Sequence, residues 1–540
     1  MTSTARRDAG SLDSHDRLAD WLIAVVIAQL IVIAFSPALR AGFVLWDDDA
    51  YFLNNPYYRG LGPAHLRWMF TVMSGHYMPL TWLTHGLDYV LWGMRPAGYH
   101  ALNVALHALA AVVAYFVARR VLAAAVERAQ PGALRAGAVV AALVFAIHPL
   151  RVESVAWITE RRDVLCGVFF LFAVLCYLRA LDGGTRRRWY WSAVALAALA
   201  LASKALAVTL PAVLLLLDVY PLGRLGPGRW LRRDVWLEKL PFVVLSAAAA
   251  VLAIIAQRSV GTLSDLRDVG IAERLGLTAY GLVFYAWKTL VPTGLAPLYE
   301  APYDYATLTP RFAASAVVVA AAAVALVRVR GRWPGATAAG AAFVVLLLPV
   351  LGLLHFGLHI VADRNTYFAG LVPALLAGAA VLRVLHGAAS PTAVRAIGAT
   401  ALAVIVLLGA LTWRQTRVWR DSRALWTHAV AVSPSSVAHA KLGVLLDAEG
   451  RTEDAIGHFR EAVRVRPDSA YAENNWGIAL ANVWRFDEAV AHFEAAIRAQ
   501  PTYAEAHRNL QITRERLANP LGYLAAQRAS RERLARGIAR

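Results

Sequence analysis

The stretch FVLWDDDAYFLNN, residues 43–55, follows the first long apolar run and sets three carboxylates, Asp47, Asp48 and Asp49, where that run meets water. Acidic side chains beside a membrane-spanning segment are costly, at ~2.5–3.5 kcal/mol each near a bilayer centre on insertion scales. Adjacent carboxylates also repel each other, which raises the pKa of one of them. Such a pair suits a general base or a cation site. An arbitrary acidic triplet is more often a helix cap or a solvated turn, so the surrounding sequence has to decide.

The composition indicates an all-α, polytopic membrane protein. Of 540 residues, 59% are hydrophobic and 17% are charged, and the mean hydropathy is +0.49. A soluble protein of this size would carry more charge. The net charge of +18 comes mostly from Arg in short loops, which indicates orientation and argues against a nucleic-acid partner. Cys166 and Cys176 lie in one apolar run, so neither a disulfide framework nor a zinc site is predicted.

The apolar runs predict about eleven crossings of a bacterial inner membrane, each near the ~20 residues that span a bilayer. Residues 1–20 form a cytoplasmic tail without a cleavable signal, and residues 40–99 form a long first outer loop, in which 80–91 fit an interfacial helix. Residues 275–291 fit either a crossing or a half-buried helix. The predicted crossings are residues 21–39, 101–117, 136–147, 164–181, 190–202, 205–217, 242–256, 313–327, 336–354, 367–385 and 397–411.

The tail of the chain, residues 413–540, repeats with a period of 34, which is the spacing of tetratricopeptide repeats. The matching pairs are Gly443/Gly477, Ala455/Ala489, Phe459/Phe493, Ala462/Ala496 and Pro467/Pro501. The small residues let two helices pack closely and the aromatic residue fills the gap between them. We therefore predict a periplasmic α-solenoid that ends in a basic capping helix at 528–540. The solenoid would bind a protein partner along its concave face. Ordinary amphipathic helices are the alternative.

Polar side chains recur where the predicted outer loops and helix ends meet. His100, Asn103 and His107 follow at i, i+3 and i+7, so they share one helical face. A buried packing role is the alternative for His107, and extension of the ammonium to water is the alternative for Lys204. Besides the acidic triplet, the candidate site residues are His76, His85, Asp88, His100, Asn103, His107, His148, Glu153, Arg161, Arg162, Asp163, Lys204, Lys288, Asp363 and Arg364, and Glu160 lies with them in the second outer loop, where pairing of Glu with Arg is the alternative.

Acids and several cations on one side of a membrane suggest an anionic, lipid-linked substrate. The planar guanidinium of Arg364 matches phosphate oxygens two at a time, and Arg161, Arg162 and Lys204 are possible helpers. A carboxylate would deprotonate the acceptor while these cations stabilise the departing phosphate. A divalent ion, magnesium or manganese, at Asp47 and Asp48 is possible, but the His spacing matches no dedicated metal motif and the sequence requires no cofactor.

Six segments, WDDDAYFLNNP, HYMPLTWLTHGLDYVLWG, GYHALNVALHAL, FAIHPLRVESVAWITERRDVL, ASKALAVTLPAVLLLLDVYPLGRL and VADRNTYF, together resemble a known family. The chain is similar to bacterial membrane proteins with C-terminal tetratricopeptide repeats, which resemble the animal transmembrane-and-tetratricopeptide O-mannosyltransferases and, more distantly, the protein O-mannosyltransferases. The resemblance covers nearly the whole chain from about residue 43.

The resemblance implies a GT-C glycosyltransferase fold that uses a polyprenyl-phosphate sugar and inverts the anomeric centre outside the cytoplasm. It places the family's acidic pair at Asp47 and Asp48, with Glu153 and Arg161 or Arg162 in the second outer loop. Arg364 would lie at the phosphate end. The outer segment 258–274 is short, so no additional sugar-recognition domain is inserted there.

From these patterns we predict a membrane glycosyltransferase at residues 21–412. It would move mannose or another hexose from a polyprenyl-phosphate donor to a hydroxyl, in protein Ser or Thr, with an Asp general base. Two alternatives stay open. One is a non-catalytic membrane anchor for the repeats in envelope assembly, and the other is a glycosyltransferase or transporter that handles lipid-linked or polysaccharide glycan.

Overall fold

A computed structural model describes residues 3–182, 186–261, 269–353, 359–387 and 390–519. The chain divides into two compact units, of which the first contains Met1–Pro297 and Ala306–Asp421 and the second Leu298–Tyr305 and Ser422–Arg540. Apart from the short strands β1 (Tyr299–Glu300) and β2 (His359–Val361), the regular structure of the described residues is helical. The predicted all-α architecture is therefore confirmed. The predicted capping helix at 528–540 and part of the segment 258–274 lie outside the described residues.

The first unit, here called the membrane unit, holds most of the helices. They are α1 (Ser3–Phe35), α2 (Pro63–Thr71), α3 (Pro79–Trp92), α4 (Pro96–Ala125), α5 (Pro131–Ala146), α6 (Val152–Ala156), α7 (Arg161–Ala180), α8 (Arg186–Ser203), α9 (Leu210–Val219), α10 (Arg233–Leu237), α11 (Leu240–Ser259), α12 (Ile271–Leu290), α13 (Thr309–Val329), α14 (Pro334–Leu347), α15 (Thr366–Ala369), α16 (Leu371–Gly387) and α17 (Pro391–Thr416). Many begin with proline, whose fixed φ suits a first helical turn and whose missing N–H is not needed there.

Six helices among the described residues are long and apolar enough to cross a membrane, or up to eight if two bent pairs are single spans. The pairs Pro131–Ala146 with Pro149–Ala156 and Asp363–Ala369 with Leu371–Gly387 bend by 53° and 49°. The predicted count of about eleven is not confirmed. Two predicted crossings correspond to the shorter apolar helices Ala205–Val219 and Pro334–Val350, and the stretch predicted with two alternatives, 275–291, is α12. Hydropathy finds apolar runs, but it does not show where a backbone break divides them.

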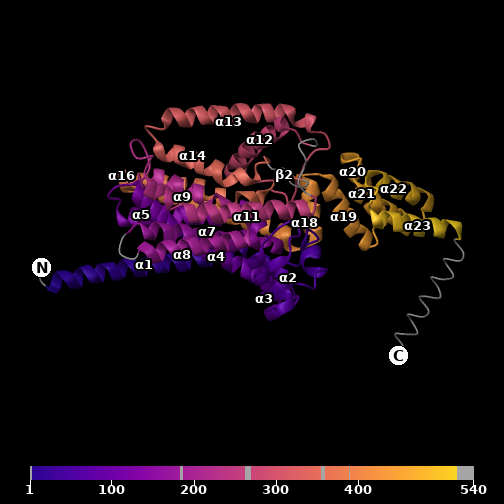
Figure 1. Ribbon diagram of the computed structural model, residues 1–540, viewed down its shortest axis with the longest axis horizontal. Helices are drawn as coiled ribbons and strands as arrows, with labels where there is room; N and C mark the ends of the chain where they lie inside the picture. Colours follow the sequence, from indigo (N-terminus) through magenta and orange to yellow (C-terminus); the bar gives the residue numbers. More distant parts are fainter. Residues whose placement is uncertain (1–2, 183–185, 262–268, 354–358, 388–389, 520–540) are drawn as a thin grey trace. The chain divides into compact units, whose positions relative to one another are not determined.

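The helices α4, α7 and α8 lie side by side in the membrane unit (Figure 1), and α5 packs between α4 and α16. Glycine permits the closest of these approaches. A Cβ added to Gly137 of α5 would lie 2.7 Å from the carbonyl oxygen of Gly378 in α16. Small residues at such crossings let helix backbones approach closely, which compensates for the weak hydrophobic drive between helices in lipid.

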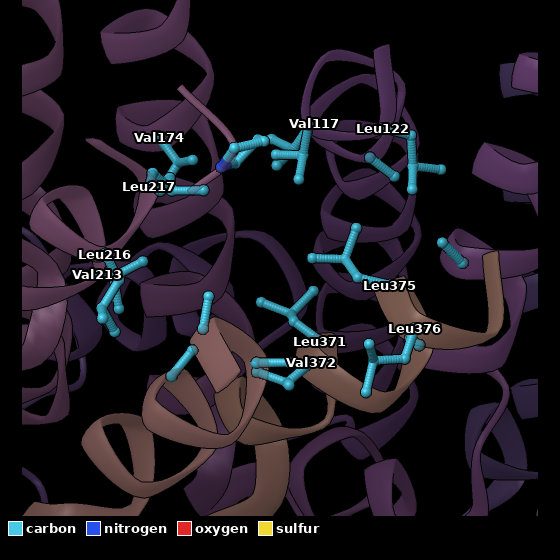
Figure 2. Close-up of a pocket in the computed structure, with 18 of the residues that line it drawn as sticks. Val117, Leu122, Val174, Val213, Leu216, Leu217, Leu371, Val372, Leu375 and Leu376 are labelled. Atoms are coloured by element: carbon cyan, nitrogen blue, oxygen red, sulfur yellow. The ribbon is translucent and has the colours of Figure 1, made fainter. Parts of the chain in front are cut away.

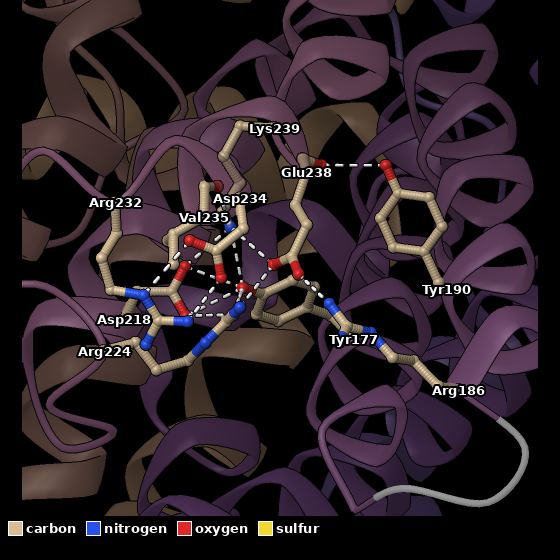
Figure 3. Close-up of polar contacts among 10 residues, drawn as sticks. All are labelled: Tyr177, Arg186, Tyr190, Asp218, Arg224, Arg232, Asp234, Val235, Glu238 and Lys239. Atoms are coloured by element: carbon tan, nitrogen blue, oxygen red, sulfur yellow. Dashed lines mark hydrogen bonds and ion pairs between the residues drawn. The ribbon is translucent and has the colours of Figure 1, made fainter.

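A polar network joins α7, α9 and the start of α11 at the end of α7 that is distant from Arg161. Figure 3 shows Asp218, Arg224 and Lys239 gathered at the hydroxyl of Tyr177. That hydroxyl donates to Asp218 Oδ2 over 2.7 Å and accepts from Arg224 Nη1 at 2.6 Å and Lys239 Nζ at 2.8 Å. Arg224 also reaches Glu238. These groups satisfy one another, so the network fixes the ends of three helices.

The second unit, here called the repeat unit, contains α18 (Ser422–Val432), α19 (Ser436–Ala448), α20 (Thr452–Val465), α21 (Ala470–Asn482), α22 (Phe486–Ala499) and α23 (Ala504–Ala518). The predicted period of 34 appears in its packing. An added Cβ would lie 2.7 Å from the Phe459 ring at Gly443 and 2.7 Å from the Phe493 ring at Gly477. Glu300 belongs to this unit because it accepts from Arg466 Nε at 3.0 Å. The tetratricopeptide assignment itself stays a prediction.

Candidate active site

The acidic triplet begins a tight turn after α1, and its members lie in different surroundings. Asp47 has a φ of 62°, an uncommon backbone conformation that Asp tolerates better than most residues and that is often found at functional sites. Its side chain is exposed. Asp48 is only 1% exposed, and its carboxylate accepts from the Val44 N–H at 3.0 Å and from Thr159 Oγ1 at 2.7 Å. Burial raises the pKa of Asp48 to about 7.

A buried aromatic cluster packs against this turn. A π-helical turn, Asp49–Leu53, carries Phe52 into a buried cluster with Tyr58, Trp82 and Tyr99. The ring of His85 packs against Phe52 with centroids 4.8 Å apart. His85 therefore serves as a packing residue of this core, which is the ordinary role of a buried histidine beside aromatic rings.

Glu160 is the centre of a buried ion cluster. Arg162 forms an ion pair with it, Lys204 Nζ lies 3.0 Å from its Oε2, and Arg364 Nε lies 3.3 Å from its Oε1. Two further acids complete the cluster: Lys204 also pairs with Asp163 at 2.7 Å, and Arg364 Nη1 lies 2.5 Å from Glu153 Oε1. The three acids and three cations balance in charge, so the cost of burying each charged group is offset by an oppositely charged partner.

Residues far apart in the sequence are brought to this cluster by short local elements. Lys204 precedes a 3-10 turn between α8 and α9, and Arg364 lies in the 3-10 turn Asp363–Asn365. Arg161, Arg162 and Asp163, expected in an outer loop, form the first turn of α7. The loop boundary predicted at residue 163 was wrong because these charged residues are compensated by buried partners and continue the helix. Lys204 does not simply extend to water, since two carboxylates hold it.

Trp157 connects the acidic turn with Arg364. Its indole Nε1 donates to the carbonyl oxygen of Trp46 at 2.9 Å, and the two indole rings stack. The guanidinium of Arg364 lies 5.6 Å from the Trp157 ring centroid, within cation–π range. Trp46, which precedes Asp47, is therefore fixed beside Trp157, and the ring of Trp157 lies against the guanidinium of Arg364.

Asp47 faces the positive part of this cluster. Its pKa is raised because the surrounding protein restricts hydration, and the charges of Arg162 and Arg364 act in the opposite direction. His76 lies in the same field, and burial together with Arg162 holds the pKa of its imidazole well below the usual 6.5. Among the described residues, Arg162 Nη1 and His76 Nδ1 are buried nitrogens without a hydrogen-bond partner. Unpaired buried donors of this kind favour a ligand at this position.

Arg161 belongs to a separate, structural network. Its guanidinium pairs with Asp88, donates from Nε to Asn103 Oδ1 at 2.7 Å and from Nη2 to the Tyr99 carbonyl at 2.7 Å. The side chains of Arg161 and Asp88 are 0% and 1% exposed. The guanidinium of Arg161 is thus occupied by protein partners, whereas Arg162 Nη1 has none among the described residues.

The predicted polar stripe on α4 is present, and its members fasten other segments to the helix. His100 Nε2 lies 3.4 Å from the Gly42 carbonyl, and Asn103 Nδ2 donates to the carbonyls of Val155 and Trp157. His107 contacts Tyr367 Oη at 2.9 Å and the Ala146 carbonyl at 2.8 Å. The packing interpretation holds for His107.

Two further candidates, His148 and Lys288, contact backbone carbonyls outside the Glu160 cluster, whereas Asp363 lies beside Glu153 of that cluster. His148 Nε2 bonds to the Thr289 carbonyl, and Lys288 donates to the carbonyls of Thr293 and Gly294. Asp363 is 3% exposed and lines a small cavity with Glu153.

A divalent ion at Asp47 and Asp48 stays a prediction. Both oxygens of Asp48 already accept hydrogen bonds, and the residues that the structure describes contain no group of three or more His, Cys, Asp or Glu side chains suited to a metal. Magnesium and manganese take several oxygen ligands in near-octahedral geometry. Magnesium can also bind through one or two carboxylates together with water and a substrate phosphate, so these contacts leave the ion a prediction, and the chemistry below uses none.

Sequence reasoning included Glu160 among the outer-loop residues without a role of its own, and it did not include Trp157 or Arg151. Glu160 lies in ITERRD, two residues before Arg162, where two acids flank two arginines and ion pairing is expected. Arg151 is 1% exposed and donates to the carbonyl and hydroxyl oxygens of Thr366, both at 2.6 Å. It thereby holds the turn that carries Arg364. No periodic signal distinguishes Arg151 from the other loop arginines.

The geometry defines a multi-helix membrane protein with a charged cluster at the start of α7 and in the turn between α8 and α9. Comparison with known proteins shows which proteins this chain is similar to. The chain is 27% identical to the protein O-mannosyl-transferase TMTC1 of Homo sapiens, over 88% of this chain and 59% of the relative. It is 26% identical to Tmtc1 of Drosophila melanogaster, over 83% and 62%, and 27% identical to TMTC3 of Mus musculus, over 84% and 52%.

The resemblance to the transmembrane-and-tetratricopeptide O-mannosyltransferases is thus confirmed over most of the chain. The chain spans between half and about three-fifths of the length of these relatives. No protein-family model matches the sequence. Among solved structures, ArnT from Cupriavidus metallidurans bound to undecaprenyl phosphate matches with a TM-score of 0.38 and 15% identity, over 88% of this chain and 79% of that one.

Proposed function

We propose that the chain is a GT-C-type glycosyltransferase that moves a hexose, mannose in the first instance, from a polyprenyl phosphate to a hydroxyl of protein Ser or Thr. The names of the relatives support the reaction class and the protein acceptor. The observation that carries the proposal is the exposed Asp47, held near Arg364 by the contacts of Trp46 with Trp157 and of Trp157 with Arg364, in the field of Arg162 and Arg364.

In the proposed reaction Asp47 accepts the proton of the acceptor hydroxyl, and the oxygen attacks the anomeric carbon. The bond from that carbon to the phosphate oxygen breaks in the same step, which inverts the anomeric centre. The departing polyprenyl phosphate gains negative charge. Arg162 has a free buried donor, and the side chains of Arg364 and Lys204 are 12% and 16% exposed, so these three cations are placed to stabilise the phosphate.

Asp48 is a positioning residue in this scheme and does not itself take the proton. Its carboxylate ties Val44 to Thr159, the residue next to Glu160, and so fixes the turn on which Asp47 stands. The side with this cluster would be the periplasmic side of a bacterial inner membrane, and the repeat unit would present a protein acceptor or a partner.

The test is transfer of radiolabelled mannose from polyprenyl-phosphate mannose to a Ser/Thr-rich peptide by the purified full chain. Asp47→Asn should reduce the rate at least about a hundredfold, in line with loss of a general base. Asp49→Asn is the matched control and should retain activity. Wild-type rates in Asp47→Asn would refute the proposed base. Label found in lipid or polysaccharide would assign a glycan acceptor, and no transfer by the wild type would favour the membrane-anchored scaffold.

A further inference from the structure

An apolar cavity of about 200 Å³ lies in the membrane unit between α4, α7, α9, α14 and α16. Figure 2 shows Val117 and Leu122 of α4 on one side of it, Leu217 of α9 on another, and Leu371 and Leu375 of α16 below. Alanine, valine and leucine make up most of the lining. A cavity with such walls does not hold water, and if it is empty its lining loses packing contacts and the fold loses stability.

This cavity lies away from the Glu160 cluster along the same helices. Phe170 and Val174, which line it, follow Arg162 by 8 and 12 residues in α7, or ~12 and ~18 Å at the helical rise per residue. On α9, the lining residues Leu216 and Leu217 come at the end that leads to the Tyr177 network. The cavity is thus closer to that network than to the proposed phosphate site.

The cavity opens to the surface of the membrane unit. Leu122 and Phe170 are each 2% exposed, whereas Leu376, also in the lining, is 46% exposed. A chain-like apolar ligand can therefore enter from the side. In a bilayer the ligand available at such an opening is a hydrocarbon tail.

Two arginines lie close in sequence to residues that line the cavity. Arg383 follows the lining residue Ala379 by about one turn of α16, and Arg332 precedes the lining residue Gly335 by three positions, just before α14. Both side chains are exposed, and neither forms an ion pair with any residue in the described ranges. The nearby cations Arg224 and Lys239 differ, because they are paired with Asp218.

We propose that this cavity binds one acyl chain of an anionic glycerophospholipid, whose phosphate lies between Arg332 and Arg383. The apolar walls select the hydrocarbon chain, and two exposed guanidinium groups, each within about one helical turn of a lining residue in the sequence, select a negative headgroup. This lipid is distinct from the polyprenyl-phosphate donor, which belongs with the Glu160 cluster at the other end of α7. The proposal does not depend on the proposed transferase activity.

Native mass spectrometry of the full chain in detergent tests the proposal. The wild type should retain one anionic phospholipid per chain, and after delipidation phosphatidylglycerol should raise the Tm whereas phosphatidylcholine with the same acyl chains should not. The double variant Arg332→Glu/Arg383→Glu should lower retention of phosphatidylglycerol at least about tenfold. Its matched control is Arg395→Glu/Arg414→Glu, which reverses two exposed arginines on α17 and should leave retention unchanged.

A second variant fills the cavity. Ala342→Phe puts a ring among the lining residues and should abolish lipid retention, while Ala322→Phe on the exposed face of α13 should not. If Ala342→Phe does not fold, Ala338→Leu takes its place. The proposal is overturned if the delipidated wild type binds phosphatidylcholine equally well, if it binds no phospholipid, or if equimolar undecaprenyl phosphate displaces phosphatidylglycerol, since the cavity would then belong to the donor's tail.

Discussion

The ammonium of Lys204 lies 3.0 Å from Oε2 of Glu160, although 44 residues separate the two in the sequence. The contact joins the turn between α8 and α9 to the start of α7. Glu160 is fully buried, and Lys204 also holds Asp163. A buried ion pair often adds little net stability over an apolar pair, but removal of one partner leaves an uncompensated charge.

We expect Lys204→Met to lower the free energy of unfolding by roughly 3 kcal/mol, because it leaves Glu160 and Asp163 with fewer cations in a buried place. The measurement is the Tm of the purified protein in one detergent. Lys288→Met is the control, since Lys288 is partly exposed, forms no ion pair among the described residues, and contacts two carbonyls and the Phe284 ring, so its loss should shift the Tm less. Equal shifts in the two variants would show that the Lys204 contacts do not stabilise the fold.

Exchange of neighbouring arginines for lysine should have different results at positions 161 and 162. Arg161 uses its planar guanidinium for Asp88, Asn103 and a carbonyl in a closed network, so Arg161→Lys should lower the Tm and leave the KM for the donor nearly unchanged. Arg162→Lys keeps the charge beside Glu160 but loses the free Nη1 donor, so it should raise the KM for the donor with a small change in Tm.

Both quantities are measured on the same preparations. A raised donor KM for Arg161→Lys at an unchanged Tm would reverse the assignment of the two arginines.

The carboxyl of Asp48 should make stability depend on pH. Burial raises its pKa to about 7 in the folded chain, above the ordinary value of 3.8 in the unfolded chain. Between these values the folded protein binds more protons at this group, so its contribution to stability is complete below pH ~4 and is lost as pH rises through ~7. We expect the Tm of the wild type to fall relative to Asp48→Asn between pH 5 and pH 8. A constant difference across this range would contradict the raised pKa.

Much of the fold follows from the sequence because hydrophobic runs and a 34-residue period are local patterns. Hydropathy identified the helices and placed Lys204 between two of them, and the acidic triplet indicated the turn that carries Asp47. The sequence placed Glu160 in an outer loop without showing its central role, and Arg151 was not identified. The importance of both residues comes from partners at positions 204, 364 and 366 that no spacing rule connects. The difference between Asp47 and Asp48 likewise depends on Thr159, which is distant in sequence.

The repeat unit offers a last prediction with a matched control. Gly443 faces the ring of Phe459, and an added Cβ would lie 2.7 Å from it, whereas Gly457 in α20 has no neighbouring atom within 4 Å of an added Cβ. Gly443→Ala should therefore overpack the α19–α20 contact at a cost of ~1–3 kcal/mol. Gly457→Ala should stabilise α20 by up to ~1 kcal/mol, because alanine has the higher helix propensity.

Hydrogen exchange of the backbone amides in α19 and α20 of the full chain measures both effects. Gly443→Ala should accelerate exchange at least about fivefold, and Gly457→Ala should slow it or leave it unchanged. Because Gly477 faces Phe493 at the same 2.7 Å, Gly477→Ala should repeat the first result in α21 and α22. If alanine at 443 and 477 exchanged like alanine at 457, the close approach of ring and glycine would not be what sets the 34-residue period.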